Sequence, residues 1–328
     1  MKQHSAISLF SGGLDSMLVV LFMRKLGYHV TPIFFKSLFF SEQKAIESAH
    51  SANFDIEVVD ISDHHLEMLK NPRYGYGKQL NPCIDCHGLM FRIAGELLTK
   101  YNADFIISGE VLGQRPMSQR MDAMNAVRKL SNVKDLIIRP LCQKLLPDTL
   151  PIREGWVDKN EMLDFSGRGR KRQIELAEEL GLKEWQAPAG GCSLTDKNMV
   201  IRLYDLIHHE QLDKNQIKFL QIGRHFRLNN QTKLIMGRDD TENNMLLGLL
   251  DEEIYIWNSD IPGPLGVIVT SESMNLDLIK YAASLVLSYN KHLKNQDGSM
   301  QYGMRDKLLG SIVVGGIEPN QLEKLRIN

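Results

Sequence analysis

The chain of 328 residues has no long uncharged apolar run and only four cysteines. Its most apolar segment, 33–40, is far too short to cross a bilayer, which takes about 20 residues. No N-terminal stretch combines the charges and the apolar run of a secretory signal peptide. We therefore expect a soluble, cytoplasmic protein without a membrane partner. The length allows two domains, each with its own core.

The chain also lacks a net charge of either sign, because 39 lysines and arginines face 40 aspartates and glutamates. This balance does not exclude a nucleic-acid partner, but positive charge that contacts phosphates must then be local. A run of charges is often only a solvated face. Two basic segments are the candidates for a phosphate-binding surface: Arg168, Arg170, Lys171 and Arg172 in one, and Arg224 and Arg227 in the other.

Four cysteines in a cytosolic chain of this size do not suggest a disulfide framework. Cys142 lies beside an apolar segment and is expected in the core. Cys83 and Cys86 form a CxxC pair where a helix is expected to begin, and a helix N-terminus lowers the pKa of a thiol. Cys192 follows two glycines, which let a loop bring its sulfur close to another site. With His87 nearby, the residues alone allow several kinds of site.

Three thiolates suit a [4Fe–4S] cluster with one open iron. A zinc ion would need a fourth ligand, for which His87 is available. A third option needs no metal, since one cysteine can carry a persulfide while another resolves the disulfide that forms. The fourth possibility is that these cysteines only stabilise the fold.

Short apolar strands alternate with helical patterns in the first half of the chain. We predict strands at 7–10, 30–35, 56–59, 105–107 and 136–138, and helices at 15–26, 41–52, 86–101, 117–130 and 169–180. This alternation is typical of an α/β fold with a doubly wound, mostly parallel sheet covered by helices on both faces. Ligands of such sheets bind at the carboxyl ends of the strands.

The pattern changes near residue 198. We predict a helix at 198–209, a hairpin within 217–236, strands at 254–257 and 266–269 and a helix at 276–287. Strands with segregated helices indicate a smaller α+β domain, so the expected domains are 1–197 and 198–328. The paired histidines His64 and His65, like His208 and His209, are expected on helix surfaces.

The stretch SGGLDS lies between the first predicted strand and the helix after it. Gly12 and Gly13 allow a phosphate to approach the backbone closely, and N–H groups at a helix N-terminus bind anions. Ser11 and Ser16 add hydroxyl donors, while Asp15 can hold a Mg²⁺ ion bound to the phosphates. No lysine follows the glycines, so this is not the GxxxxGK[ST] loop of common nucleoside triphosphatases.

This loop resembles the PP-loop of the ATP pyrophosphatases, which split ATP between its α- and β-phosphates and usually adenylate a carbonyl-type oxygen. The resemblance concerns roughly the first 200 residues. Farther along, SGE at 108–110, LGQ at 112–114, SQ at 118–119 and IRPL at 138–141 look like the catalytic domain of tRNA 4-thiouridine synthetases. That likeness implies an adenine site near Phe34 and Phe35 and a nucleotide site lined by Ser108, Gly109, Glu110 and Gln114.

The resemblance also bears on the cysteines. Several tRNA thiolation enzymes of the PP-loop class bind a cluster through a CxxC pair and one distant cysteine, which corresponds here to Cys83, Cys86 and Cys192. The RNA-binding modules and the rhodanese-like sulfur carrier of some 4-thiouridine synthetases are not evident in this sequence. Instead, segments 223–227 and 237–244 look similar to the NFACT-R type of RNA-binding domain.

Together these resemblances imply an ATP-dependent tRNA sulfurtransferase that uses ATP and Mg²⁺. Its catalytic residues would be Asp15, Cys83, Cys86 and Cys192. A base carbonyl oxygen of tRNA would be adenylated and then replaced by sulfur from a cysteine desulfurase or from free sulfide. The alternatives are a PP-loop ligase acting on a small molecule, which the C-terminal domain disfavours, and a non-catalytic, ATP-responsive RNA-binding protein, which the intact Asp15 and the three cysteines disfavour.

Overall fold

The computed structural model describes residues 4–77, 80–185, 192–293, 296–305 and 307–327. Contacts divide the chain into two compact parts, Met1–Thr195 and Asp196–Asn328, which we call unit 1 and unit 2. The boundary predicted between residues 197 and 198 falls at the start of α8 (Lys197–His208), the first helix of unit 2. In the described part of the chain, no helix is both long enough and apolar enough to cross a membrane.

Among the described residues of unit 1, five parallel strands form a sheet in the order β3-β2-β1-β4-β5. This confirms the predicted parallel sheet. The strands are β1 (Ser5–Leu9), β2 (His29–Lys36), β3 (Glu57–Asp60), β4 (Phe105–Ser108) and β5 (Ile137–Ile138). The α-helices are α1 (Leu14–Lys25), α2 (Gln43–Ser51), α3 (Ser62–Lys70), α4 (Cys83–Leu97), α5 (Met121–Leu130), α6 (Leu150–Arg153) and α7 (Lys171–Glu179). Single 3₁₀ turns occupy Lys134–Leu136, Gln143–Leu145, Lys159–Glu161 and Ser193–Thr195.

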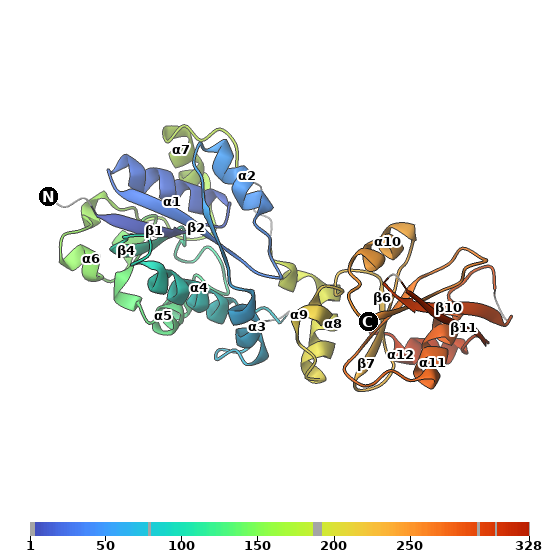
Figure 1. Ribbon diagram of the computed structural model, residues 1–328. Helices are drawn as coiled ribbons and strands as arrows, with labels where there is room; N and C mark the ends of the chain where they lie inside the picture. The colour runs from blue at the N-terminus through green and yellow to red at the C-terminus, as the bar shows by residue number, and fades with distance from the viewer. Residues whose placement is uncertain (1–3, 78–79, 186–191, 294–295, 306, 328) are drawn as a thin grey trace. The chain divides into compact units, whose positions relative to one another are not determined.

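Helices cover both faces of this sheet (Figure 1). One core joins the sheet to α1, α2 and α7, and a second core joins its other face to α3, α4 and α5. Successive side chains of a strand point to opposite faces. In β2, Phe34 therefore belongs to the first core and Phe35 to the second.

One histidine prediction is wrong. His64 is exposed on α3 as expected, but only 1% of His65 is exposed. The His65 ring packs edge-on against Phe39 and Phe40, with centroids 5.5 Å away in each case. Burial lowers the pKa of His65 to about 4, so the imidazole is neutral at physiological pH. Adjacent positions on a helix point in different directions, which is why one histidine enters the core and its neighbour does not.

The described part of unit 2 contains a six-stranded antiparallel sheet in the order β11-β10-β8-β9-β7-β6. Its strands are β6 (Arg224–Arg227), β7 (Thr232–Met236), β8 (Ile254–Trp257), β9 (Gly266–Thr270), β10 (Gly298–Met304) and β11 (Lys307–Val314). Besides α8, the helices are α9 (Lys214–Ile217), α10 (Asp240–Gly248), α11 (Leu276–Ser288) and α12 (Pro319–Leu325). The predicted hairpin is confirmed as β6–β7, whereas α10 and the β10–β11 hairpin were not predicted.

Helix α11 packs on one face of this sheet, where Phe226 and Leu234 meet Ala282 and Val286 in a common core. The other face has a smaller core that includes residues of α10, among them Leu246. Unit 2 therefore has its own hydrophobic interior, as expected for an α+β domain.

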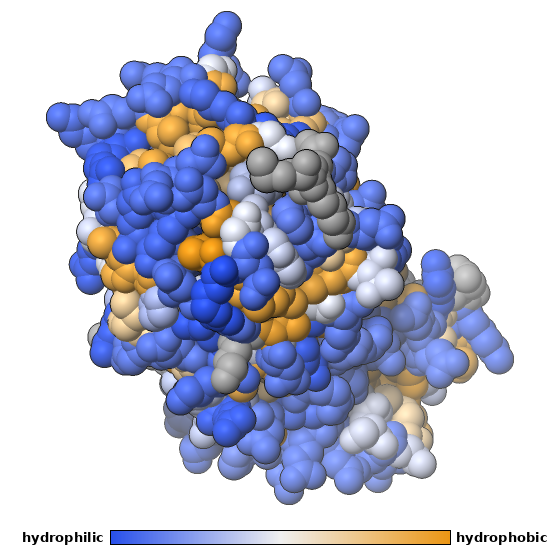
Figure 2. All heavy atoms as spheres, turned by 90° about the vertical axis from the view of Figure 1, so that its left-hand side faces the viewer, coloured by the Kyte–Doolittle hydropathy of each residue, from blue (hydrophilic) through white to orange (hydrophobic). Residues whose placement is uncertain are grey.

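On the face of the molecule that Figure 2 shows, hydrophobic residues emerge in separate patches. Hydrophilic residues surround and divide these patches. Scattered apolar side chains are ordinary on a protein surface, and they give no reason to propose a docking site on this face.

The packing of α4 on α5 depends on Gly88. A Cβ atom at this buried position would lie 2.5 Å from the Cβ of Leu130. We expect Gly88→Val to destabilise the protein by about 1–3 kcal/mol, because the added carbons overpack the interface. Urea unfolding measures the change, and Gly169→Val is the control since no atom lies within 4 Å of a Cβ there. Equal unfolding midpoints for both variants would contradict this packing.

Candidate functional site

The phosphate-binding loop predicted at residues 11–16 follows β1, and the loop at 109–114 follows β4, its neighbour in the sheet. The chain proceeds from β1 to β2 on one side, while β4 lies on the other side. The two loops therefore flank the point where the strand order reverses. In doubly wound sheets this switch point is the usual place for a nucleotide.

The 11–16 loop folds tightly onto the start of α1. Gly12 has a φ of +77°, and a Cβ atom there would lie 2.9 Å from the Cα of Ala45. The Ser16 hydroxyl donates to the Gly13 carbonyl oxygen at 2.8 Å and accepts from the Ser11 N–H at 3.3 Å. No side chain among the described residues caps the N-terminus of α1. Its first N–H groups therefore remain available to an anion.

The loop after β4 touches this turn directly. A Cβ atom at Gly109 would lie 2.5 Å from the Asp15 carbonyl oxygen and 2.7 Å from the Ser16 nitrogen, so only glycine fits. The Gln114 amide donates to Asp15 Oδ2 at 2.7 Å, and Gln173 of α7 in turn donates to Gln114 at 3.3 Å. These contacts fix both the backbone and the carboxylate of Asp15.

The Asp15 carboxylate also lies near Gln173, but no described residue donates a hydrogen bond to its second oxygen within ordinary bonding geometry. Oδ1 is buried and makes no hydrogen bond within the described residues. Burial raises the pKa of Asp15, while the Gln114 hydrogen bond and the charges of Arg170 and Arg115 oppose that rise. A buried carboxylate oxygen without a donor is a suitable ligand for a hard cation.

Arg115 is a site residue that the sequence motifs did not single out. Its charge lowers the pKa of Asp15 and also that of Cys83. The exposed side chain therefore lies within electrostatic reach of both the phosphate loop and the CxxC pair. The sequence could have indicated Arg115, because it directly follows Gln114 in the motif that is expected to line the nucleotide site.

The predicted basic run at 168–172 does not act as a single patch. Arg170 faces the phosphate loop closely enough to lower the pKa of Asp15. Arg172 is paired with Asp164 and stacks over a phenylalanine ring. Lys171 lies 3.9 Å from Glu175 on the same helix, and Arg168 is exposed. Of this run, Arg170 is thus the residue that joins the site at the switch point.

The three predicted site cysteines lie within electrostatic reach of one another. Cys83 begins α4, and Cys86 lies one turn farther along. The loop of Cys192 is fastened to the segment after β2, because the Ser193 N–H and hydroxyl both donate to the Phe39 carbonyl oxygen at 3.0 Å. Burial raises the pKa of Cys86, and the neighbouring Cys192 and Cys83 raise it further. The glycines at 190 and 191 lie outside the described residues.

The expectation of thiols with lowered pKa is wrong for this structure. Burial raises the pKa of Cys83 despite the opposing charge of Arg115, and it raises that of Cys192 to about 11. Desolvation of a thiolate therefore outweighs the helix terminus. In the described ranges, no three histidine, cysteine or acidic side chains are already arranged to hold a metal ion. All four cysteines are free thiols.

Cys142 is buried, as predicted for a core cysteine. Its thiol contacts the Glu110 carbonyl oxygen at 3.2 Å, and burial raises its pKa to about 11. It serves below as a control for the other three.

A buried chain of charged side chains extends behind the cysteines. Glu110 accepts from Arg139 Nε at 2.7 Å and contacts His87 Nδ1 at 2.9 Å, while Ser108 donates to it at 3.3 Å. Burial alone would raise the pKa of Glu110, but Arg139 and His87 outweigh it and hold the pKa at about 2. Both oxygens of Glu110 are thus engaged within the protein, so its predicted contact with a nucleotide is not through a free carboxylate.

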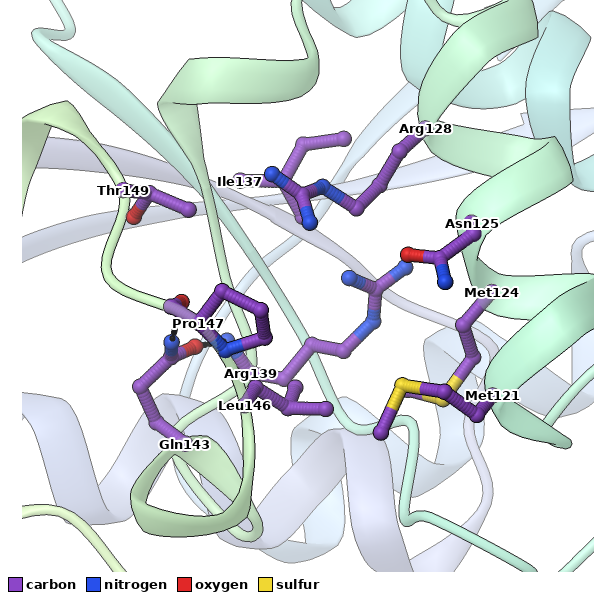
Figure 3. Close-up of a pocket in the computed structure, with 10 residues that line it drawn as sticks. All are labelled: Met121, Met124, Asn125, Arg128, Ile137, Arg139, Gln143, Leu146, Pro147 and Thr149. Atoms are coloured by element: carbon purple, nitrogen blue, oxygen red, sulfur yellow. Dashed lines mark hydrogen bonds between the residues drawn. The ribbon is translucent and has the colours of Figure 1, made fainter.

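Figure 3 shows the Arg139 guanidinium beside Asn125 and Arg128, at a cavity of about 10 Å³. Arg139 Nη2 is buried there without a hydrogen-bond partner in the described part of the chain. The cavity has about the volume that one water molecule needs and is too small for a nucleotide. This cavity is therefore not a candidate nucleotide site.

The residues predicted to lie near the adenine, Phe34 and Phe35, also have buried side chains. Only 7% of Phe34 and 3% of Phe35 are exposed, because both side chains belong to the cores. Contact of these residues with a nucleotide would therefore involve the backbone of β2 and not the aromatic rings.

In unit 2, the two predicted phosphate contacts differ in kind. Arg227 is paired with Asp205 and donates to Gln211 at 2.8 Å. Buried Lys233 lies 3.8 Å from the same aspartate. These internal contacts engage the Arg227 guanidinium within unit 2. Arg224 instead lines a cavity of about 110 Å³.

Comparison with known proteins gives matches to both units. Residues 1–144 match the family described as thiamine biosynthesis protein (ThiI), and residues 223–326 match the NFACT protein RNA binding domain. Two relatives are described as probable tRNA sulfurtransferases. The protein of Methanosarcina acetivorans is 26% identical over 217 residues, covering 64% of this chain and 46% of the relative. The protein of Finegoldia magna is also 26% identical over 217 residues, covering 62% of this chain and 47% of the relative.

The chain thus spans about half the length of these curated relatives. A crystal structure of a 4-thiouridine synthetase–RNA complex with bound ATP is 20% identical, with a TM-score of 0.39, over 55% of this chain and 41% of that one. The two family matches lie in different units of the fold. Residues 1–144 are therefore similar to the ThiI family, and residues 223–326 are similar to the NFACT RNA binding domain.

Proposed function

We propose that this protein is an ATP-dependent tRNA sulfurtransferase. The observation that carries the proposal is the meeting of two loops at the switch point of unit 1, where Gly109 packs on the backbone of Asp15 and Ser16. Arg115 connects that point electrostatically to Cys83. The names of the relatives and the RNA-binding family of unit 2 support tRNA as the substrate.

In the first step, unit 1 binds ATP with its pyrophosphate portion on the uncapped N–H groups of α1. Asp15 Oδ1 would hold Mg²⁺, which supplies charge neutralisation on the phosphates. Arg170 and Arg115 add positive charge beside them. A carbonyl oxygen of a flipped-out tRNA base attacks the α-phosphorus. The new O–P bond forms as the bond to the β-phosphate oxygen breaks, and pyrophosphate leaves.

In the second step, a sulfur nucleophile attacks the base carbon that bears the adenylate. A C–S bond forms and the C–O bond breaks, so AMP leaves with its oxygen. The sulfur comes either from free sulfide or, by way of a cysteine desulfurase, from a persulfide on one of the cysteines. In the second case another of the three cysteines then breaks the S–S bond to the base, and the protein disulfide that forms is reduced by an external thiol. We assign Cys83, Cys86 and Cys192 to holding the sulfur, because they are the thiols gathered beside Arg115 and the phosphate loop.

The same three cysteines suit a [4Fe–4S] cluster. Two nearby segments supply three free thiols; Cys83 and Cys192 raise the pKa of Cys86, and Cys83 also raises that of Cys192. Binding of a metal removes such thiol protons. The cluster would supply an open iron to which sulfide binds. The ligands are not arranged around a metal beforehand in the described residues, so binding would have to order them.

We expect Asp15→Asn to lower tRNA-dependent pyrophosphate release at least about 100-fold, because the metal that it holds contributes several kcal/mol of charge stabilisation. The amide oxygen can still accept from Gln114, so the fold should survive. Asp55→Asn, at an exposed position, is the control and should be as active as the wild type. Mass spectrometry of the tRNA should detect a thiolated nucleoside with wild type and control only. Full activity of folded Asp15→Asn contradicts the proposal.

For the cluster, we expect protein purified without oxygen to contain iron and acid-labile sulfide and to absorb visible light. Serine at position 83, 86 or 192 should remove the iron and the absorbance, since each thiolate is a ligand. Cys142→Ser should keep both, because that thiol lies in the core. Iron-free, thiolating wild-type protein would exclude the cluster and leave persulfide chemistry on the same cysteines.

The Glu110–Arg139 pair should hold the site in place. We expect Glu110→Gln to destabilise the protein by about 3–5 kcal/mol at pH 7, because it leaves a buried arginine without its partner. Since the folded pKa of Glu110 is about 2 and its ordinary value is 4.5, the wild type loses this stabilisation as the pH falls from about 4.5 toward 2. Urea unfolding at several pH values, with exposed Glu178→Gln as control, measures it. A difference that does not shrink toward low pH contradicts this role.

A further inference from the structure

Four arginines surround one cavity in unit 2. Arg202 comes from α8, Arg224 from β6, Arg238 follows β7, and Arg326 lies just after α12. The cavity holds about 110 Å³, roughly ten times the space that one water needs. No aspartate or glutamate is among the residues that line it. Such a concentration of one charge is notable in a chain without net charge.

Internal contacts hold three of these arginines in position. Arg202 donates to the carbonyl oxygens of Leu220 and Gly223, at 2.6 and 2.7 Å. Arg238 makes a two-pronged ion pair with Glu242, with Nε 2.8 Å from Oε1. The Arg224 guanidinium lies over the Tyr289 ring, 5.4 Å from its centroid. These contacts orient the side chains before any ligand arrives.

Arg326 differs from the other three. It is exposed, and its guanidinium makes no hydrogen bond or ion pair within the described residues. Its backbone is nevertheless fixed, because Arg326 bridges to Phe226 of β6 and the next residue donates to the His225 carbonyl oxygen at 2.9 Å. An arginine without an acceptor on a fixed backbone is prepared to bind an anion from outside.

The charges also repel one another. Burial lowers the pKa of Arg202, and the charges of Arg238 and Arg326 lower it further. One carboxylate, Glu242, pairs with one of the four guanidinium groups around the cavity. A bound anion would offset this repulsion. Guanidinium groups match the oxygens of phosphate in geometry and donate charge-assisted hydrogen bonds to them.

We propose that this arginine pocket binds one phosphate group of an RNA. The choice of RNA rests on the proposed function, whereas the choice of phosphate rests on the four guanidinium groups. The phosphate belongs either to the backbone or to a 5′ end, and both present the same oxygens. Three of the arginines that line the pocket, Arg202, Arg238 and Arg326, lie outside the basic segments identified in the sequence. Arg227, which belongs to one of those segments, does not line the pocket.

The test measures binding of labelled tRNA to the full chain at several salt concentrations. Arg326→Gln should flatten the log–log salt dependence by about one unit and weaken binding about tenfold at 0.1 M salt relative to 1 M. Arg326→Lys should restore most of the slope, because it keeps the charge. Arg305→Gln, an exposed arginine outside the cavity, is the matched control and should resemble the wild type.

A second variant tests whether the loss of binding belongs to the pocket as a whole and not to Arg326 alone. Arg224→Gln should weaken binding to a similar degree, and urea unfolding should show that both variants remain folded. Oligoribonucleotides with a 5′-phosphate or a 5′-hydroxyl distinguish the two sources. A loss confined to the phosphorylated oligonucleotide assigns the pocket to the 5′ end, and an equal loss for both assigns it to the backbone.

If Arg326→Gln and Arg224→Gln bind tRNA with the wild-type affinity and the wild-type salt dependence, the pocket does not bind an RNA phosphate. The proposed function would not be affected by that result. Absence of tRNA binding by the wild type would overturn both.

Discussion

The close approach of Gly109 to the backbone of Asp15 and Ser16 is the constraint on which the site of unit 1 depends. Parallel strands bring the loops after β1 and β4 to one edge of the sheet, but only a residue without a Cβ lets them touch. Once they touch, Gln114 reaches the Asp15 carboxylate, and Arg115 lies near both the phosphate loop and the CxxC pair. One glycine thus relates the nucleotide machinery to the thiols.

Much of this arrangement could be predicted from the sequence, because it depends on local patterns. Alternating apolar strands and helices specified the parallel sheet, and a glycine turn between a strand and a helix specified the anion site. The β10–β11 hairpin was missed because β10 contains two glycines and Val313 of β11 is 71% exposed, so neither strand shows a clear apolar alternation.

The burial of individual side chains could not be predicted from local sequence patterns. The helix start at Cys83 indicated a lowered thiol pKa, but packing by distant segments desolvates the thiol and raises it. His65 is likewise neutral and buried because Phe39 and Phe40, from another part of unit 1, cover it. For Cys83, desolvation outweighs the effect of the helix N-terminus, whereas for His65 the expected surface position itself was wrong.

The same reasoning applies to the arginines, whose roles depend on their partners and not on their clustering in sequence. Arg227 and Arg172 are engaged by Asp205 and Asp164, whereas Arg326, which stands in no basic run, has a free guanidinium within the described residues. The two proposed anion sites are also built differently. In the proposal for unit 1, a reacting triphosphate would meet backbone N–H groups and a carboxylate that can hold a metal, which suits a phosphate whose charge changes during reaction. A phosphate that is only held in place needs no such metal, and fixed guanidinium groups are sufficient for it.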